Sequence, residues 1–306
     1  MEILACGEAL VDIVRDEDGT PRSIPGGSPF NVAIGLARFG IGVGFLGKVS
    51  LDAHGEALVH QLSENGVDTS FVVRSPRPTA IARVTTSFGE EPRYAFAIDG
   101  TADRSLEIDQ VPGRLPDTIQ ALHFGSYSLA LDPTASTLET LMAREADRRI
   151  ISLDPNVRPA LLPCKRTYRE SFERWISFAH IVKLSTADFA WIYPEADLNM
   201  IVQNWLRTRT RLVVLTCGAN GATAFTRAAT HHMLGVAVVV RDTVGAGDSF
   251  MAALLAALAE RGRLSMASID RLSETDIGFA LCLATKAAAI TCSRAGADPP
   301  RRQDIT

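Results

Sequence analysis

Residues 241–248 read Arg241-Asp-Thr-Val-Gly-Ala-Gly-Asp248, and they lie between an apolar run at 236–240 and an apolar helical pattern at 249–260. The run at 236–240 predicts a buried strand, so the glycines are expected to form a turn from this strand into a helix. Such a turn leaves unpaired backbone N–H groups at the positive end of the helix dipole, where they can bind an anion. The stretch therefore predicts an anion site at a strand-to-helix turn, as found in α/β folds.

Asp248 ends this glycine turn, and its carboxylate has two alternative roles. It would repel a ground-state phosphate, yet it can accept the proton of an attacking hydroxyl. Amides that stabilise a phosphoryl group, beside a base for the nucleophile, are what phosphoryl transfer needs. An Asp at a helix start also commonly caps the helix. The local residues leave both roles open.

Short apolar segments alternate with amphipathic segments along most of the chain, which predicts an α/β sheet covered by helices on both faces. Strands are expected at 3–7, 42–46, 121–125, 150–154, 181–184, 212–216 and 236–240. Helices are expected at 30–39, 55–65, 134–146, 168–178, 187–192, 200–208, 249–260 and 275–290. Ligands of such sheets bind at the carboxyl ends of the strands.

Two regions near the N-terminus break this alternation. Residues 67–100 contain β-branched runs separated by Pro and Gly, and a hairpin can be drawn across 9–25 around the turn Glu17-Asp18-Gly19. We expect these regions to form a small sheet inserted in a single domain that spans 1–306. Such a sheet could cover a site as a lid.

The composition is that of an ordinary globular enzyme, with 46% apolar and 22% charged residues among 306. A net charge of −4 offers no basic field for nucleic acid or anionic lipid, so neither partner is expected. The five cysteines are scattered without a C-x-x-C pair, so no structural zinc is indicated. The N-terminus runs directly into a strand-like segment, and we expect a cytoplasmic protein.

The glycine turn matches the D-T-x-G-A-G-D signature of the PfkB (ribokinase-like) family of carbohydrate kinases. A second family signature is matched by Gly26-Gly-Ser-Pro-Phe-Asn-Val-Ala-Ile-Gly-Leu-Ala-Arg-Phe-Gly40. Shorter matches are Gly7-Glu-Ala-Leu-Val-Asp12, Gly47-Lys-Val-Ser-Leu-Asp-Ala-His-Gly55 and Thr216-Cys-Gly-Ala-Asn-Gly221. The chain thus resembles the family over its whole length. The resemblance implies a three-layer α/β/α sandwich with a mostly parallel central sheet and a small β-sheet lid.

The resemblance also implies transfer of a phosphoryl group from ATP to a sugar hydroxyl, with Asp248 as the base. The residues implied in this site are Gly245, Ala246 and Gly247 for the anion hole, Asp12, Gly27 and Asn31 for the sugar, and Lys183, Thr216, Gly218 and Gly221 for ATP. The implied ions are Mg²⁺ and K⁺, the latter held by Asp242 and the Val244 carbonyl. The family's N-x-x-E is replaced by Ser185-Thr-Ala-Asp188, which leaves the role of Asp188 toward Mg²⁺ open.

Within the family, the segments 26–31, 122–130 and 154–159 most resemble fructokinases, which implies D-fructose as the substrate. Arg158 follows an expected strand end, where it could fork onto sugar hydroxyls, bind a carboxylate or form a structural salt bridge. The related 2-keto-3-deoxygluconate kinases share this Arg and carry a Tyr-x-Arg in the lid. Residues 94–98 read Tyr94-Ala-Phe-Ala-Ile98, so a neutral ketohexose fits better than a sugar acid.

Phe96 and Ile98 are therefore expected to pack against the sugar, although either could be core of the lid. The alternatives are a kinase for 2-keto-3-deoxygluconate or another small sugar or nucleoside, and a non-catalytic sugar sensor. A homodimer through the lid is expected by analogy with relatives.

Overall fold

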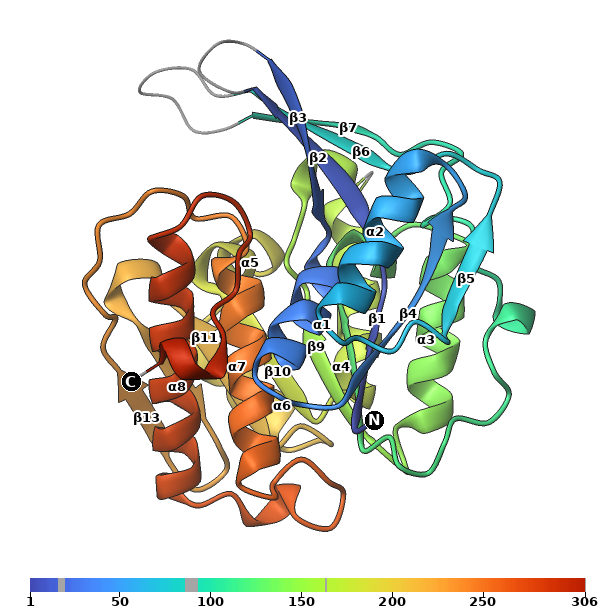
Figure 1. The fold of residues 1–306 in the computed structure, drawn as a ribbon. Coiled ribbons are helices and arrows are strands. Elements are labelled where there is room, and N and C mark those ends of the chain that lie inside the picture. Colours follow the sequence, from blue (N-terminus) through green and yellow to red (C-terminus); the bar gives the residue numbers. More distant parts are fainter. Residues whose placement is uncertain (16–19, 86–92, 163, 306) are drawn as a thin grey trace.

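A computed structural model of the chain describes residues 1–15, 20–85, 93–162 and 164–305. Within these ranges the strands form two sheets, of which the larger has nine strands and is mostly parallel (Figure 1). Its strands, in spatial order, are β13 (Thr230–Met233), β12 (Ala222–Phe225), β11 (Leu212–Thr216), β10 (Ile181–Ser185), β9 (Ile150–Asp154), β8 (Ala121–Gly125), β1 (Ile3–Cys6), β4 (Val43–Ser50) and β5 (Val72–Ser75). Only β12 and β13, at one edge, run antiparallel to their described neighbours.

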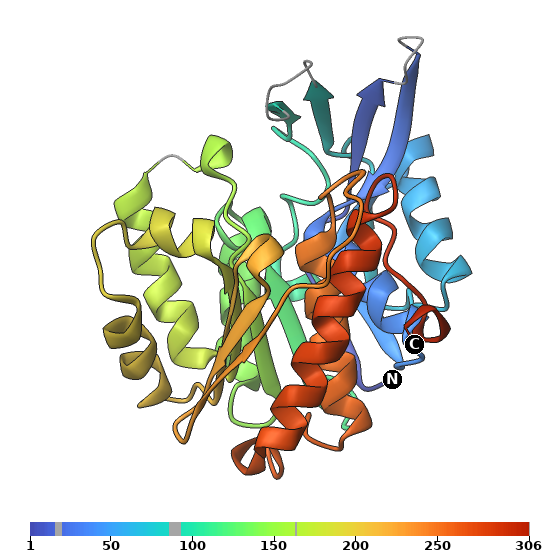
Figure 2. The ribbon, with the colours of Figure 1, turned by 90° about the vertical axis from the view of Figure 1, so that its left-hand side faces the viewer.

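Helices cover both faces of this sheet, which gives the predicted three-layer α/β fold (Figure 2). The helices are α1 (Ser28–Arg38), α2 (Ala53–Glu64), α3 (Thr134–Glu145), α4 (Lys165–Phe178), α5 (Thr186–Ile192), α6 (Leu198–Leu206), α7 (Ala246–Glu260) and α8 (Glu274–Cys292). Short 3₁₀ helices lie at Ile108–Gln110, Ser126–Leu129, Pro159–Leu161, Gly218–Asn220, Ile269–Arg271 and Arg302–Asp304.

The core is divided by the sheet into two apolar layers. On β1, Ile3 and Ala5 pack with α1, α2, α7 and α8, whereas Leu4 and Cys6 pack with α3 to α6. Successive side chains of a strand point to opposite faces, so a strand between two helical layers must be apolar throughout. This burial explains why β1, with the sequence Ile-Leu-Ala-Cys, is a continuous apolar run.

The smaller sheet, which we call the lid sheet, lies beyond the carboxyl ends of the parallel strands (Figure 1). Its strands, in spatial order, are β3 (Pro21–Gly26), β2 (Leu10–Arg15), β6 (Ile81–Thr85) and β7 (Arg93–Ala97). It consists of two antiparallel hairpins that a parallel β2–β6 pair joins. The turn expected at Glu17-Asp18-Gly19 lies outside the described residues.

The lid sheet is smaller than the sequence predicted, because the expected segment 67–100 is shared between the two sheets. β5 pairs in parallel with β4 at the edge of the larger sheet, with Gly47 opposite Val72. Helix α2 forms the crossover between them, as a parallel pair requires. Only β6 and β7 of this segment join β2 and β3.

The strand predicted at 236–240 is wrong. This segment has no regular secondary structure, and the side chains of Val236, Val238, Val239 and Val240 are exposed. β12 and β13, which the sequence did not predict, already form the antiparallel edge of the sheet. The apolar run therefore follows the edge strand and has no neighbouring strand in the described ranges.

Helix α8 is long and apolar enough to cross a membrane by length and composition alone, with a mean hydropathy of 1.3. In this fold it packs along α7 in one covering layer, and 56% of the apolar window is buried. The apolar side chains of α8 thus contribute to the packing of the sandwich.

Candidate active site

A cavity of about 450 Å³ lies between the lid sheet and the carboxyl ends of the parallel strands. The N-termini of α1 and α7 and the loop after β9 reach it, so it is built from distant parts of the chain. Its lining contains the predicted residues Asp12, Gly27, Asn31, Phe96, Arg158, Val244, Gly245, Gly247 and Asp248. The cavity therefore unites most of the sugar-binding and catalytic positions that the family resemblance implied.

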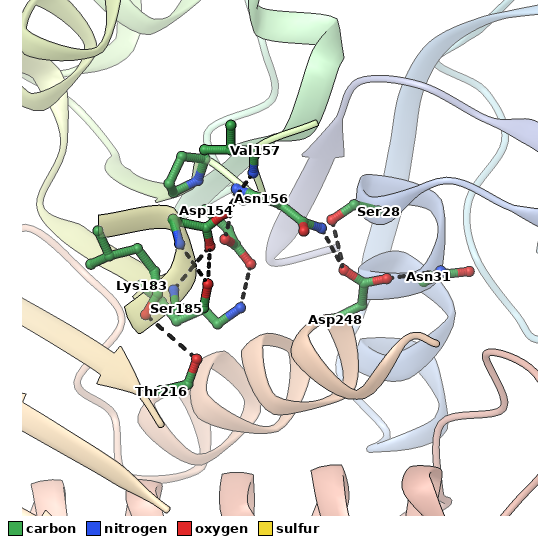
Figure 3. A network of polar contacts seen from close by, with 12 residues as sticks. Ser28, Asn31, Asp154, Asn156, Val157, Lys183, Ser185, Thr216 and Asp248 are labelled. Carbon is green, nitrogen blue, oxygen red and sulfur yellow. Dashed lines mark hydrogen bonds and ion pairs between the residues drawn. The ribbon is translucent and has the colours of Figure 1, made fainter. Parts of the chain in front are cut away.

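Asp248 is held inside the cavity and does not cap α7. The N-cap is Gly245, whereas Asp248 is the third residue of the helix and is only 6% exposed. Its Oδ1 accepts hydrogen bonds from Ser28 Oγ (2.7 Å) and Asn156 Nδ2 (3.3 Å), and its Oδ2 accepts one from Asn31 Nδ2 (2.8 Å) (Figure 3). The carboxylate thus lies where a sugar hydroxyl could reach it, in a geometry suited to a base.

The turn before Asp248 requires its glycine. Gly245 has φ +75°, and a Cβ there would lie 2.6 Å from the Cβ of Ala297. The N–H groups of the first turn, at Ala246, Gly247 and Asp248, have no intrahelical carbonyl partner because they begin the helix, and that of Ala246 makes a long contact of 3.3 Å with the Thr243 carbonyl. These amides and the helix dipole can stabilise negative charge beside Asp248.

Asp12, on β2, is a second carboxylate of the cavity, and its pKa is shifted upward. Burial raises it to about 6 against the lowering effect of the Arg158 guanidinium, and the charge of Asp248 raises it further. A Cβ at Gly26 would lie 2.6 Å from the Asp12 carboxylate, so the neighbouring strand must be small at that point. Arg158 itself donates to the side-chain oxygen of Asn156 at 2.7 Å.

The two lid residues proposed from the sequence lie in different environments. Phe96 lines the cavity, and its ring meets that of Tyr127 edge to face at 6.5 Å between centroids. Ile98 is buried in a small apolar cluster with Leu10 and Ala82 and is not among the lining residues. The structure therefore places Phe96 at the site and Ile98 in the core of the lid.

Among the lining residues that were not predicted from the sequence, Glu8, Ser28 and Asn156 make polar contacts. Glu8 is 1% exposed, its Oε1 accepts from the Ser28 N–H at 3.2 Å, and burial raises its pKa to about 7. Glu8 directly follows a strand end and Ser28 lies inside the glycine signature. A strand end and a glycine signature are both visible in the sequence, so these two residues could have been predicted as part of the site.

The residues implied for ATP lie outside this cavity, along the neighbouring strand ends. Lys183 on β10 is buried and pairs with Asp154 on β9 at 2.7 Å (Figure 3). Burial alone would lower the pKa of Lys183, but the charge of Asp154 outweighs it and raises the pKa. The Lys183 ammonium lies 3.0 Å from where a Cβ of Gly247 would be, so it borders the anion hole.

The other implied ATP residues lie at the carboxyl end of β11. Thr216 is the last residue of that strand; Gly218, with φ +56°, begins the following 3₁₀ turn, and Gly221, with φ +89°, comes directly after it. A Cβ at Gly221 would lie 2.0 Å from the Met233 carbonyl, so this turn needs glycine.

The side chains considered as metal ligands are engaged in backbone contacts. Asp188 forms the capping box of α5 with Ser185, and its Oδ1 accepts from the Val157 N–H at 2.8 Å. Asp242 accepts from the N–H groups of Val244 and Gly296 and so joins two loops. In the described part of the chain, no group of three or more His, Cys, Asp or Glu side chains is placed to hold a metal.

A carboxylate in the first turn of a helix, beside backbone N–H groups and beneath a second sheet, is an arrangement suited to a kinase for small hydroxylated molecules. The chain belongs to the pfkB family of carbohydrate kinases, because the model of that family matches residues 2–304. It is 39% identical over 276 residues to a fructokinase of Rhizobium leguminosarum bv. trifolii, covering 89% of this chain and 84% of the relative.

Two solved structures show the same fold. The fructokinase of Xylella fastidiosa with bound ATP has a TM-score of 0.90 at 29% identity, covering 97% of this chain and 93% of that one. The fructokinase of Vibrio cholerae O395 with fructose, ADP and a calcium ion has a TM-score of 0.85 at 26% identity, covering 97% and 94%. The family and the mostly parallel fold with a second sheet, both predicted from the sequence, are confirmed.

Proposed function

We propose that this protein transfers the γ-phosphoryl group of ATP to a hydroxyl of D-fructose. The observation that carries the choice of a neutral sugar is the charge of the cavity. Its described lining contains three carboxylates, at Glu8, Asp12 and Asp248, and a single cationic side chain, Arg158. A sugar acid would meet net negative charge there, whereas a neutral polyol meets acceptors for its hydroxyl groups.

The reaction follows from the position of Asp248. Its carboxylate takes the proton of the attacking hydroxyl as the sugar oxygen forms a bond to the γ-phosphorus. The bond from that phosphorus to the β,γ-bridging oxygen breaks, and ADP leaves with its electron pair. The amides of Gly245, Ala246 and Gly247, with Lys183 beside them, stabilise the charge on the transferring group.

Magnesium is expected to accompany the nucleotide. When bound, Mg²⁺ neutralises charge on the phosphates, and it usually keeps several waters while using few protein ligands. The hydrogen bonds already made by Asp188 favour contact through water over direct ligation. Activation by K⁺ near Asp242 and Val244, a homodimer through the lid sheet and a cytoplasmic location stay predictions.

One observation favours a second candidate, a kinase for a sugar acid such as 2-keto-3-deoxygluconate. The guanidinium of Arg158 lines the cavity and could bind a carboxylate. A panel of hexoses, pentoses, nucleosides and sugar acids, assayed by coupled detection of ADP, separates the two candidates. We expect turnover of D-fructose; turnover confined to sugar acids would overturn the choice of a neutral substrate.

Asp248→Asn tests the base directly. The change should lower kcat by about 10²- to 10⁴-fold, since general base catalysis contributes that much, while D-fructose still binds by calorimetry. Asp117→Asn, which removes one partner of an exposed ion pair with Arg114, is the matched control and should keep full activity. Sugar binding without turnover by the unaltered protein would instead indicate a sugar sensor.

A further inference from the structure

The two oxygens of the Asp248 carboxylate are in unequal environments. Oδ1 accepts two hydrogen bonds, from Ser28 Oγ and Asn156 Nδ2, and Oδ2 accepts one, from Asn31 Nδ2 (Figure 3). An ionised carboxylate offers about four lone-pair sites, two on each oxygen. Both acceptor sites of Oδ1 are therefore occupied, and the acceptor site that is still free to take a proton lies on Oδ2.

The contact with Ser28 is the shortest of the three, at 2.7 Å, and its direction is unambiguous. An ionised carboxylate cannot donate, so the hydroxyl of Ser28 must be the donor. A hydrogen bond to a charged acceptor in a buried site is about twice as strong as a neutral one. Ser28 is 5% exposed, so water cannot easily replace it.

Ser28 is itself fixed by its backbone. It is the first residue of α1, and its N–H donates to Oε1 of the buried Glu8 at 3.2 Å. The preceding Gly27 has φ +112°, and a Cβ there would lie 2.7 Å from the Glu8 carbonyl. Close packing between these two segments leaves Ser28 little freedom to move away from Asp248.

We propose that Ser28 is a positioning residue for Asp248, whose hydroxyl occupies Oδ1 and turns the free lone pair of Oδ2 toward the sugar hydroxyl. The proposal rests on the proposed role of Asp248 as the base. It holds whether Asn31 stays on Oδ2 or turns to the sugar, since either arrangement leaves an open site on that oxygen.

Ser28→Ala removes the hydroxyl and keeps the backbone contact with Glu8. We expect kcat to fall about tenfold or more, because a hydrogen bond to a charged group is lost, with the sugar KM changed less than about twofold. Ser75→Ala, at a buried serine on β5 that is not among the lining residues of the cavity, is the matched control and should keep kcat. A raised KM with unchanged kcat would make Ser28 a sugar-binding residue and overturn the proposal, as would unchanged kinetics.

A second measurement asks whether Ser28 acts only through the carboxylate. Added to Asp248→Asn, Ser28→Ala should leave the residual rate unchanged, because residues that act as a unit are not additive. A further tenfold fall in the double variant would overturn the proposal. The rates of the variants are compared on whichever sugar the unaltered protein phosphorylates. The test therefore does not depend on D-fructose being the substrate.

A crystal structure of Ser28→Ala gives a readout that needs no turnover. The Asp248 carboxylate should leave its position and lose its contact with Asn31 or Asn156. An unmoved carboxylate would overturn the positioning role even if no sugar were phosphorylated. The substrate panel thus tests the proposed function, whereas the position of the Asp248 carboxylate tests this inference.

Discussion

Two carboxylates of the cavity, those of Asp12 and Glu8, have raised pKa values because burial disfavours their charged forms. Burial raises the pKa of Asp12 to about 6 and that of Glu8 to about 7. The guanidinium of Arg158 limits the rise for Asp12, and a pKa of about 6 leaves this carboxyl mostly ionised at pH 7. An ionised Asp12 can accept hydrogen bonds from sugar hydroxyls, whereas a protonated one has lost part of that capacity.

The KM for the sugar should therefore depend on pH through Asp12. As the pH falls through about 6, Asp12 takes up a proton and the KM should rise, and above this value the KM should be constant. Asp12→Asn should show a raised KM whose pH dependence is much weaker over the same range. Because Glu8 titrates nearby, the comparison of the two profiles is needed. An Asp12→Asn profile as steep as that of the unaltered protein would contradict the assignment.

The sequence predicts the residues of the site that belong to motifs, and it cannot predict their partners. Asp248, Asn31 and Gly27 follow from glycine signatures whose spacing is visible along the chain. Ser28 and Asp248, by contrast, are 220 positions apart and meet only because α1 and α7 pack side by side. Hydrogen bonds across such separations depend on packing, which no local pattern encodes.

At the scale of elements, one buried carboxylate joins the two helices of the outer layer. Asp276, near the start of α8, is 1% exposed and accepts from Arg261 at 3.0 Å and Arg263 at 2.8 Å, just beyond the end of α7. It also completes a capping box with Ser273. The contact fixes one end of α7, the helix whose other end carries Asp248.

Asp276→Asn should destabilise the fold by about 1–2 kcal/mol at pH 7, since it leaves two guanidinium groups, both partly exposed to solvent, without their charge partner. Burial alone would raise the pKa of Asp276, but hydrogen bonds from Ser273, Arg261 and Arg263 outweigh it and hold the pKa far below its usual range. The stabilisation is therefore present above the unfolded pKa of about 4 and is lost as the pH falls below it.

Urea unfolding at pH 7 and at about pH 3 measures this effect. The difference between Asp276→Asn and the unaltered protein should shrink at the lower pH. Asp147→Asn, at an exposed pair with Arg209, should stay within about 1 kcal/mol at both values. A difference that is the same at both pH values would contradict the electrostatic account.

The periodicity of the sequence predicts the helices and the buried parallel strands well, because both are encoded by local apolar patterns. It fails at 236–240, where an apolar β-branched run is exposed and unpaired. It also misses β12 and β13, whose residues, such as Thr223 and His232, carry no continuous apolar signal. β12 forms a strand by pairing with β11, and β13 by pairing with β12, so both depend on the edge of the sheet.

At the scale of the molecule, the lid sheet is attached to the body through several contacts, among them Val11 of β2 in the main apolar core and the packing of β2 and β3 against α2. An apolar cluster joins Leu10, Ala82 and Ile98 of the lid region to Tyr127 of the body. Asp52 at the start of α2 accepts from both the N–H and the hydroxyl of Thr79, just before β6. The cavity lies between these two bodies, so a bound sugar contacts both.

Sugar binding should therefore slow amide hydrogen exchange in β2 and β7, whose Asp12 and Phe96 line the cavity, by about tenfold or more at saturation, because a ligand protects the elements it contacts. Strands β10 and β11 should be little changed by sugar alone, since Thr216 and Lys183 lie outside the cavity. Mass spectrometry of the exchanged protein resolves the two regions. Equal slowing in both, or none in the lid, would contradict the placement of the sugar.

The parallel β2–β6 pair has a consequence for changing the substrate of this protein. The lid sheet comes from two separate insertions into the body, and the register that joins them sets Val11 opposite Ile81 and Ile13 opposite Arg83. An exchange of lids between two relatives thus requires two simultaneous grafts whose strands match in register. The sugar pocket therefore cannot be transferred between relatives by exchanging one continuous segment of sequence.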